Sequence, residues 1–171
     1  IIKLRKKYKK ELKEQPDPIK KARSNAFKLL ANASYGYHGF FGARYYCPEA
    51  AAATASLARK HIKETMDRTR EEGYNVIYSD TDGYAFQLGD HSREDAEKLL
   101  EKLNENLPGI MELDLEGFFK RGIWVTKRSG KFGAKKKYAL IDYDGDMKVR
   151  GFETVRRDWC DLARETQNKV L

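Results

Sequence analysis

The sequence has 171 residues, 40% of them apolar and 35% charged, which is enough apolar material for one folded domain, or one domain with an appendage. The net charge of +8 favours a polyanionic partner. No apolar run approaches membrane-spanning length, no signal peptide is visible, and two cysteines, Cys47 and Cys160, are too few for a disulfide framework or a zinc site. We therefore expect a cytoplasmic protein without a membrane partner.

Prolines and capping residues divide the chain into predicted helices. Pro16 ends a first helix rich in lysine and glutamate, and Asp17 followed by Pro18 has the pattern of an N-cap and a first helical residue. Ser92 and Asp95 have the spacing of a capping box, which opens a later helix. The predicted helices cover residues 1–15, 17–35, 48–72, 92–107 and 158–171. The last helix is amphipathic, and its apolar side consists of Trp159, Leu162, Ala163 and Val170.

Alternating apolar residues predict strands in much of the remaining chain. Two strands, at 74–78 and 84–88, flank a tight turn and should form a hairpin. Further strands are predicted at 118–119, 123–126, 138–141 and 147–149. Helices and strands joined by long connections indicate an α+β fold, with helices on one face of an antiparallel sheet.

The tip of the predicted hairpin carries two carboxylates, Asp80 and Asp82, separated by one residue. Paired hard oxygen ligands suit a Mg²⁺ ion that also grips a substrate phosphate. The same pattern occurs in solvated hairpin turns, and a second acidic turn at 142–146 has that ordinary character. The turn by itself leaves both interpretations open.

One face of the second predicted helix carries a polar stripe. Lys28, Asn32 and Tyr35 follow the spacing i, i+4, i+7, and Lys21 extends the stripe by two turns. Such a stripe could bind a phosphate, make a polar contact and pack against a base; it could equally be a solvated helix face. The opposite side, which we expect to be buried, consists of Ala26, Leu30 and Ala33.

Four motifs in a fixed order resemble those of family B DNA polymerases, most closely the archaeal replicative members. Residues 28–36, KLLANASYG, resemble motif B, and residues 78–82, YSDTD, resemble motif C. Residues 135–138, KKKY, resemble the family's basic motif, and residues 151–159 resemble the segment that leads into the thumb. Together they cover nearly the whole chain.

The resemblance implies a fold and a division into domains. The fold would be a palm-type antiparallel sheet with a projecting helical hairpin from the fingers. Residues 1–36 would be part of the fingers, 37–157 the palm and 158–171 the start of the thumb helix.

The resemblance also implies template-directed nucleotidyl transfer by two Mg²⁺ ions, with primer–template DNA and deoxynucleoside triphosphates as substrates. Asp80 and Asp82 would be the catalytic metal ligands, with Asp82 the stronger candidate for direct coordination.

The other matched motifs would bind the substrates. Lys28 would contact the incoming triphosphate, and Asn32 and Tyr35 would line the nascent base pair. The residues implied to contact DNA are Lys135, Lys136, Lys137, Tyr138, Arg156 and Arg157. A basic edge strand in solvent is the alternative for the first four of these.

The chain departs from the family pattern in three ways. Ala33 stands where motif B usually has serine, and we expect this change to be tolerated. The loop at 128–135 is longer than in close relatives, and no role follows for it. Motif A, whose aspartate is the other essential metal ligand, does not occur in this sequence.

We therefore expect an excised palm or the small subunit of a split enzyme, with little activity alone and a larger partner that carries motif A. Two other functions remain open: a non-catalytic DNA-binding module with the palm fold, and an assembly subunit whose exposed apolar surface marks lost domains.

Overall fold

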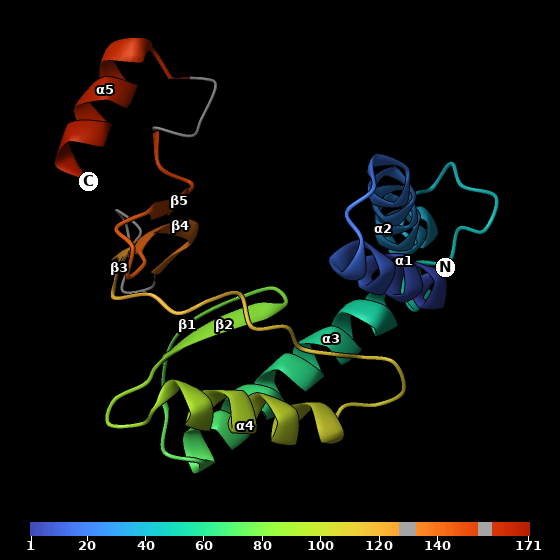
Figure 1. The fold of residues 1–171 in the computed structure, drawn as a ribbon. Coiled ribbons are helices and arrows are strands. Elements are labelled where there is room, and N and C mark those ends of the chain that lie inside the picture. The colour runs from blue at the N-terminus through green and yellow to red at the C-terminus, as the bar shows by residue number, and fades with distance from the viewer. Residues whose placement is uncertain (127–132, 154–158) are drawn as a thin grey trace. The chain divides into compact units, whose positions relative to one another are not determined.

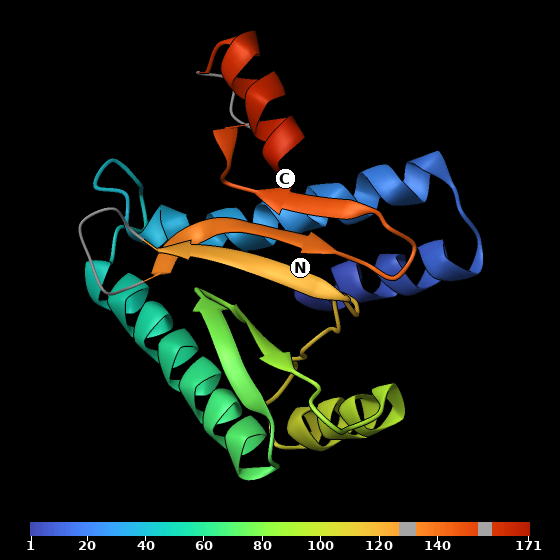
Figure 2. The same ribbon diagram turned by 90° about the vertical axis from the view of Figure 1, so that its left-hand side faces the viewer.

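The computed structural model describes residues 1–126, 133–153 and 159–171, without the side chains of Lys13 and Lys135. The chain consists of two compact units, Ile1–Lys60 and His61–Leu171, and the residues of each unit mainly contact one another. Figures 1 and 2 show the elements of each unit. The helix α3 begins in the first unit and ends in the second.

The first unit is built on a helical hairpin of α1 (Ile2–Glu14) and α2 (Pro18–His38), followed by the start of α3 (Pro48–Glu71). Asp17 caps α2 as predicted, because its side chain accepts a hydrogen bond from the Ile19 amide at 2.9 Å and Pro18 follows it. The Tyr8 and Phe27 rings stack between the two helices, with centroids 5.6 Å apart.

The buried side of α2 was predicted wrongly. Leu30 is 53% exposed, and Ala26 and Ala33 are exposed as well. The half-buried stripe instead contains Phe27 and Ala31, because α1 packs against that part of the helix. Apolar residues lie on more than one side of α2, and the sequence pattern does not tell which side the neighbouring helix covers.

The helix α2 is also longer than predicted and ends at His38, past Gly36. The Gly36 backbone does not adopt a positive φ, and its carbonyl accepts a hydrogen bond from the Gly39 amide at 3.1 Å. Gly39, three residues later, is therefore the C-cap.

The second unit contains a hairpin of β1 (Asn75–Asp80) and β2 (Gly83–Gln87), followed by α4 (Arg93–Glu105). The predicted capping box at the start of α4 is confirmed in both directions, between Ser92 and Asp95. A small core of Tyr74, Leu99 and Leu103 lies between the hairpin and α4, where Phe86 and Leu88 also pack. In Figure 1, α4 and the end of α3 lie on the same side of this hairpin.

A second antiparallel sheet has the strand order β3–β4–β5. Its strands are β3 (Arg121–Thr126), β4 (Gly133–Ile141) and β5 (Met147–Arg150). Residues 118–119 do not form the predicted strand. The Phe118 ring packs beneath Arg93 and the Phe119 ring beneath Lys148, so these aromatic residues are held by side-chain contacts rather than by strand pairing.

The α+β prediction is confirmed, although the strands of the described residues form two small sheets rather than one. The last helix, α5 (Asp161–Val170), begins after Cys160, so Trp159 precedes it instead of belonging to its apolar side. None of the helices in the described ranges is long and apolar enough to cross a membrane.

Candidate functional site

The two aspartates of the hairpin tip lie on a turn of only two residues. Asp80 ends β1 and pairs with Gly83, which begins β2. Thr81 adopts a left-handed φ of 53°, and the Asp82 amide donates a hydrogen bond to the Asp80 carbonyl at 2.7 Å. This backbone geometry holds both carboxylates at the same end of the hairpin.

The two carboxylates differ in their surroundings. The Asp80 side chain is 15% exposed, and its Oδ1 accepts a hydrogen bond from the Thr81 hydroxyl at 3.1 Å. The Lys136 Nζ atom lies 3.9 Å from Asp80 Oδ2. Asp82 is exposed to solvent. One carboxylate is thus partly enclosed and faces a cation, while the other is open to an incoming ligand.

The donor set fits part of a Mg²⁺ site. Carboxylate oxygens are the ligands that Mg²⁺ prefers, and it commonly keeps one or two carboxylates together with substrate phosphates and waters. Within the part of the chain that the structure describes, no group of three or more His, Cys, Asp or Glu side chains could hold a metal. Asp80 and Asp82 are therefore two carboxylates on one turn without a third such side chain beside them in the described ranges.

An aromatic cluster joins the strand that leads into the acidic turn to the second sheet. The Tyr78 ring lies 5.9 Å from Trp124 and 5.5 Å from Tyr138, measured between ring centroids. The Lys136 amide donates a hydrogen bond to the Tyr78 hydroxyl at 2.9 Å. Burial raises the pKa of Tyr78, and the hydrogen bond from the Lys136 amide opposes this effect. The predicted residues Asp80, Lys136 and Tyr138 are thereby brought together.

The remaining residues of the basic motif have different positions. The Lys137 ammonium donates a hydrogen bond to Glu153 Oε1 at 2.8 Å and lies 5.2 Å from the Phe152 ring centroid. Its charge is therefore directed away from the acidic turn. The Lys135 backbone belongs to β4, and its side chain is outside the described part, as are Arg156 and Arg157. Most of the loop at 128–135 also lies outside it.

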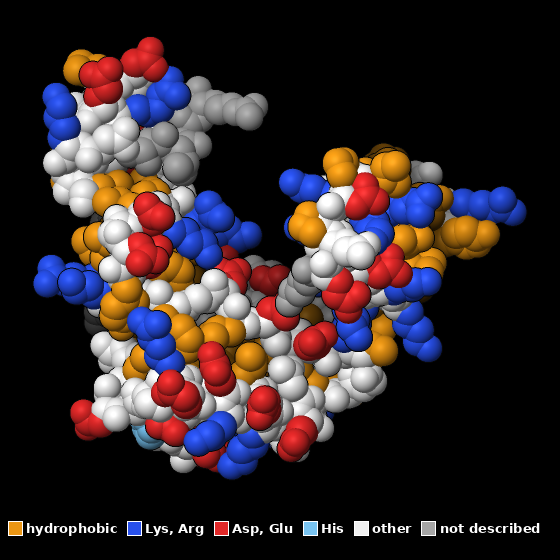
Figure 3. All heavy atoms as spheres, viewed as in Figure 1, with side chains coloured by type: hydrophobic (Ala, Val, Ile, Leu, Met, Phe, Trp, Pro, Cys, Tyr) orange, Lys and Arg blue, Asp and Glu red, His pale blue; other side chains and the backbone are white. Residues whose placement is uncertain are grey.

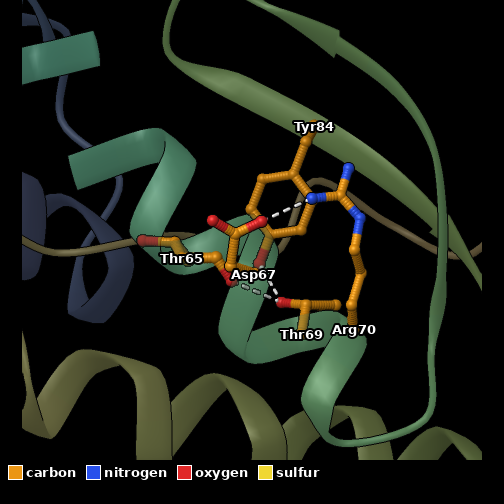
Figure 4. A network of polar contacts seen from close by, with 5 residues as sticks. All are labelled: Thr65, Asp67, Thr69, Arg70 and Tyr84. Atoms are coloured by element: carbon orange, nitrogen blue, oxygen red, sulfur yellow. Dashed lines mark hydrogen bonds and ion pairs between the residues drawn. The ribbon is translucent and has the colours of Figure 1, made fainter. Parts of the chain in front are cut away.

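A buried hydroxyl network supports the strand that leaves the acidic turn (Figure 4). The Thr69 side chain is fully buried, and its Oγ1 lies 2.8 Å from the Tyr84 hydroxyl. Thr69 donates its proton to the Thr65 carbonyl at 2.9 Å, so the Tyr84 phenol is the donor between the two hydroxyls. Tyr84 follows Gly83 directly, and the network therefore fixes the start of β2 on α3.

The polar stripe of α2 belongs to the first unit, whereas the acidic turn belongs to the second. Lys28, Asn32 and Tyr35 are all exposed, and Tyr35 retains 48% of its accessible surface. All three side chains are accessible to a ligand along one helix face.

Two contributors to the site, Tyr78 and Trp124, could not be recognised from the sequence pattern. Tyr78 stands in the motif C match, but its role depends on a contact with Lys136, which is 58 residues away in sequence. Trp124 lies in a strand of ordinary alternation, and no local signal marks it.

The model of DNA polymerase family B matches residues 1–171, the whole chain. The chain belongs to DNA polymerase family B. It is 44% identical to "DNA polymerase 1" of Pyrococcus abyssi (strain GE5 / Orsay) over 179 aligned positions, which cover 100% of this chain and 22% of that protein. It is 41% identical to a DNA polymerase of Thermococcus gorgonarius, with the same coverage.

A solved structure agrees with these relatives. The family B DNA polymerase of the hyperthermophilic archaeon Pyrobaculum calidifontis superimposes with a TM-score of 0.69 at 30% identity, covering 99% of this chain and 20% of that one. This family B chain therefore spans about a fifth of the length of the polymerases it matches.

Proposed function

We propose that the chain supplies the acidic turn, the nucleotide-binding helix face and the DNA-tracking strand of a template-directed DNA polymerase. The observation that carries this proposal is the approach of the basic strand to β1: Lys136 lies beside Asp80, and the Tyr138 ring packs against Tyr78. A turn that only capped a solvated hairpin would need neither the aromatic cluster nor the basic residue beside it.

Asp82 would bind Mg²⁺ directly, and Asp80 would lie beside it as a second ligand. The bound Mg²⁺ would supply activation of the primer 3′ hydroxyl and neutralisation of the charge that develops on the phosphates during in-line displacement. Asp82 is open to solvent and could reach a nucleotide-bound metal, whereas Asp80 is partly enclosed and lies beside Lys136.

The exposed stripe of α2 would hold the nucleotide. Lys28 would pair with the triphosphate as a point charge, while Asn32 and Tyr35 would line the nascent base pair. The exposure of all three side chains on one helix face supports this assignment.

The charge distribution supports contact with a polyanion along the first unit. Residues 1–60 contain 14 of the 34 lysines and arginines but 4 of the 26 aspartates and glutamates, a net charge of +10, which leaves −2 for residues 61–171. Figure 3 shows lysine and arginine side chains standing out on the face of α1 and α2 that it draws. In the second unit, Lys135, Lys136, Tyr138, Arg156 and Arg157 would track the duplex by contacts to its backbone.

A polypeptide that carries motif A would complete the metal site. Because the two aspartates lie on one turn, they cannot surround two metal ions from opposite sides, and no third metal-binding side chain joins them among the described residues. The missing aspartate would come from the much larger part of the polymerase that this chain does not span.

Primer extension tests the proposal. We expect the chain alone, with Mg²⁺ and all four deoxynucleoside triphosphates, to add few or no nucleotides, and a polypeptide carrying motif A to restore synthesis. Asp82→Ala should abolish synthesis by the reconstituted complex. Asp144→Ala is the matched control, because it removes an exposed carboxylate from the second acidic turn and should leave synthesis unchanged. Normal extension by the Asp82→Ala complex would refute the metal assignment.

A non-catalytic DNA-binding module is the second candidate, and the +10 charge of residues 1–60 favours it independently of the aspartates. It predicts DNA binding without synthesis even when the motif A polypeptide is present. The same assay therefore separates the two functions.

A further inference from the structure

The strand β4 contains a left-handed residue directly beside the acidic turn. Lys136 has a φ of 60°, a conformation that lysine adopts rarely because its Cβ crowds the carbonyl that follows. The pairing of β4 with β3 is irregular at this point, since Trp124 pairs with Tyr138 but Thr126 pairs with Gly133. The extra residues of β4 form a bulge, which re-aims the backbone of Lys136 away from the ladder.

The neighbouring strand accommodates this bulge through a glycine. Tyr138 pairs with Arg150 at the end of β5, and Gly151 follows with a φ of 67°. A Cβ at Gly151 would lie 2.0 Å from the Lys136 carbonyl oxygen and 2.9 Å from its carbonyl carbon. No side chain fits in that space, because backbone atoms rather than a mobile side chain occupy it.

Two contacts depend on the resulting position of Lys136. Its amide donates the hydrogen bond to the Tyr78 hydroxyl at 2.9 Å, and its Nζ lies 3.9 Å from Asp80 Oδ2. Both partners belong to β1, the strand that carries the acidic turn. The bulged residue Lys136 therefore makes both of these contacts between β4 and β1.

We propose that Gly151 is a positioning residue: the absence of its side chain lets the Lys136 carbonyl approach, and this holds the Lys136 amide on Tyr78 and the Lys136 ammonium beside Asp80. The effect on DNA synthesis rests on the proposed function, whereas the positioning itself does not. Gly151 touches neither substrate nor metal in this assignment and acts through Lys136.

Amide hydrogen exchange, read by NMR on the full 19.8 kDa chain, tests the positioning. We expect Gly151→Ala to speed the exchange of the Lys136 amide by roughly tenfold, as the loss of one hydrogen bond would. Tyr78→Phe, which removes the acceptor, should speed the same amide by a similar factor, and the double variant should be no faster than either. The Ala139 and Leu140 amides, farther along β4, should keep their rates.

Gly109→Ala is the matched control. Gly109 has a φ of 62°, close to that of Gly151, but a Cβ there would meet nothing within 4 Å. It imposes the same backbone strain without the contact, so the Lys136 amide should exchange at its original rate. An unchanged Lys136 rate in folded Gly151→Ala, or an equal increase in Gly109→Ala, would overturn the proposal.

The unsubstituted chain provides a second measurement in case Gly151→Ala does not fold. The coupling between the Lys136 amide and Hα protons reports its φ directly. A left-handed value together with fast exchange in Tyr78→Phe would uphold the proposal, and an extended φ would contradict it.

A synthesis assay extends the test to function. In the complex reconstituted with motif A, Gly151→Ala should lower the rate of nucleotide addition about tenfold or more, since small displacements of a catalytic group are costly. Gly109→Ala should leave it unchanged. If the unsubstituted complex makes no DNA, the proposed function fails, while the exchange result still decides the role of Gly151.

Discussion

Thr69 and Tyr84 form a partly buried polar contact at the start of β2. The Thr69 side chain has no accessible surface, and its hydroxyl is both the acceptor for Tyr84 and the donor to Thr65. A buried hydroxyl that loses its partner bears the full cost of its desolvation. These two residues therefore link the stability of the second unit to the position of β2.

We predict that Thr69→Val lowers the free energy of unfolding of the second unit by about 1–3 kcal/mol, because it leaves the Tyr84 phenol without an acceptor. Urea denaturation followed by circular dichroism measures the change. Thr166→Val is the control: its hydroxyl also donates to a carbonyl four residues earlier, but on an exposed helix, and its loss should cost much less. Equal losses in the two variants would contradict the importance of burial.

The raised pKa values of two tyrosines predict that the fold loses stability at alkaline pH. Burial raises the pKa of Tyr84 and of Tyr74 above the ordinary value of 10.0. The unfolded chain therefore releases these protons first as the pH rises, so the contribution to stability is complete below about pH 10 and falls above it. Tyr84→Phe should show a smaller loss of stability above pH 10 than the unsubstituted chain, each relative to its own value at pH 7. An unchanged alkaline slope would mean that Tyr84 does not contribute.

At the level of elements, the sequence predicted correctly the helix caps and the turn that depend on neighbouring residues. The caps at Asp17 and Ser92 and the turn at Asp80 were correct, because each depends on residues within a few positions. The buried face of α2 and the strand at 118–119 were wrong, because the first depends on where α1 packs and the second on aromatic contacts to distant cations. Periodicity shows that a face is apolar, whereas tertiary packing selects which face is covered.

The α1–α2 hairpin provides a direct test of this correction. Phe27→Ala removes the ring that stacks on Tyr8 and should destabilise the hairpin by about 1–2 kcal/mol. Leu29→Ala, at a position 69% exposed, should cost less than about 0.5 kcal/mol. Amide exchange along α1 distinguishes them, since only the first change should speed it. A larger effect from Leu29→Ala than from Phe27→Ala would contradict the packing of α1 on the Phe27 side of α2.

At the level of the whole molecule, the sequence predicted the family and the class of fold, but not how the site is assembled. Asp80 and Asp82 could be selected from their spacing and their motif. The approach of Lys136 to the turn could not, because it needs a bulge in β4 and a glycine in the next strand. The net charge indicated a polyanionic partner without revealing that residues 1–60 carry all of the excess. The assignment of residues 1–36, 37–157 and 158–171 to fingers, palm and thumb stays a prediction.

This division of charge predicts the salt dependence of DNA binding. The slope of log K against log salt should weaken by about 0.9 for each phosphate contact removed, so Lys21→Ala should reduce it. Lys98→Ala, in the negatively charged second unit, should leave the slope unchanged. Fluorescence anisotropy with duplex DNA at several salt concentrations measures it. A slope that responds only to Lys98 would place the contact in the other unit.

The packing of Trp124 against Tyr78 and Tyr138 has a practical consequence. The chain has two tryptophans, and Trp159→Phe would leave Trp124 as the sole indole. Its ring lies 5.9 Å from Tyr78 and 6.4 Å from Tyr138, well within range for excitation energy to pass from the phenols to the indole. The emission of Trp124 would then report, in real time and without an added label, on whether the strand carrying the aspartates moves when a metal ion or a nucleotide arrives.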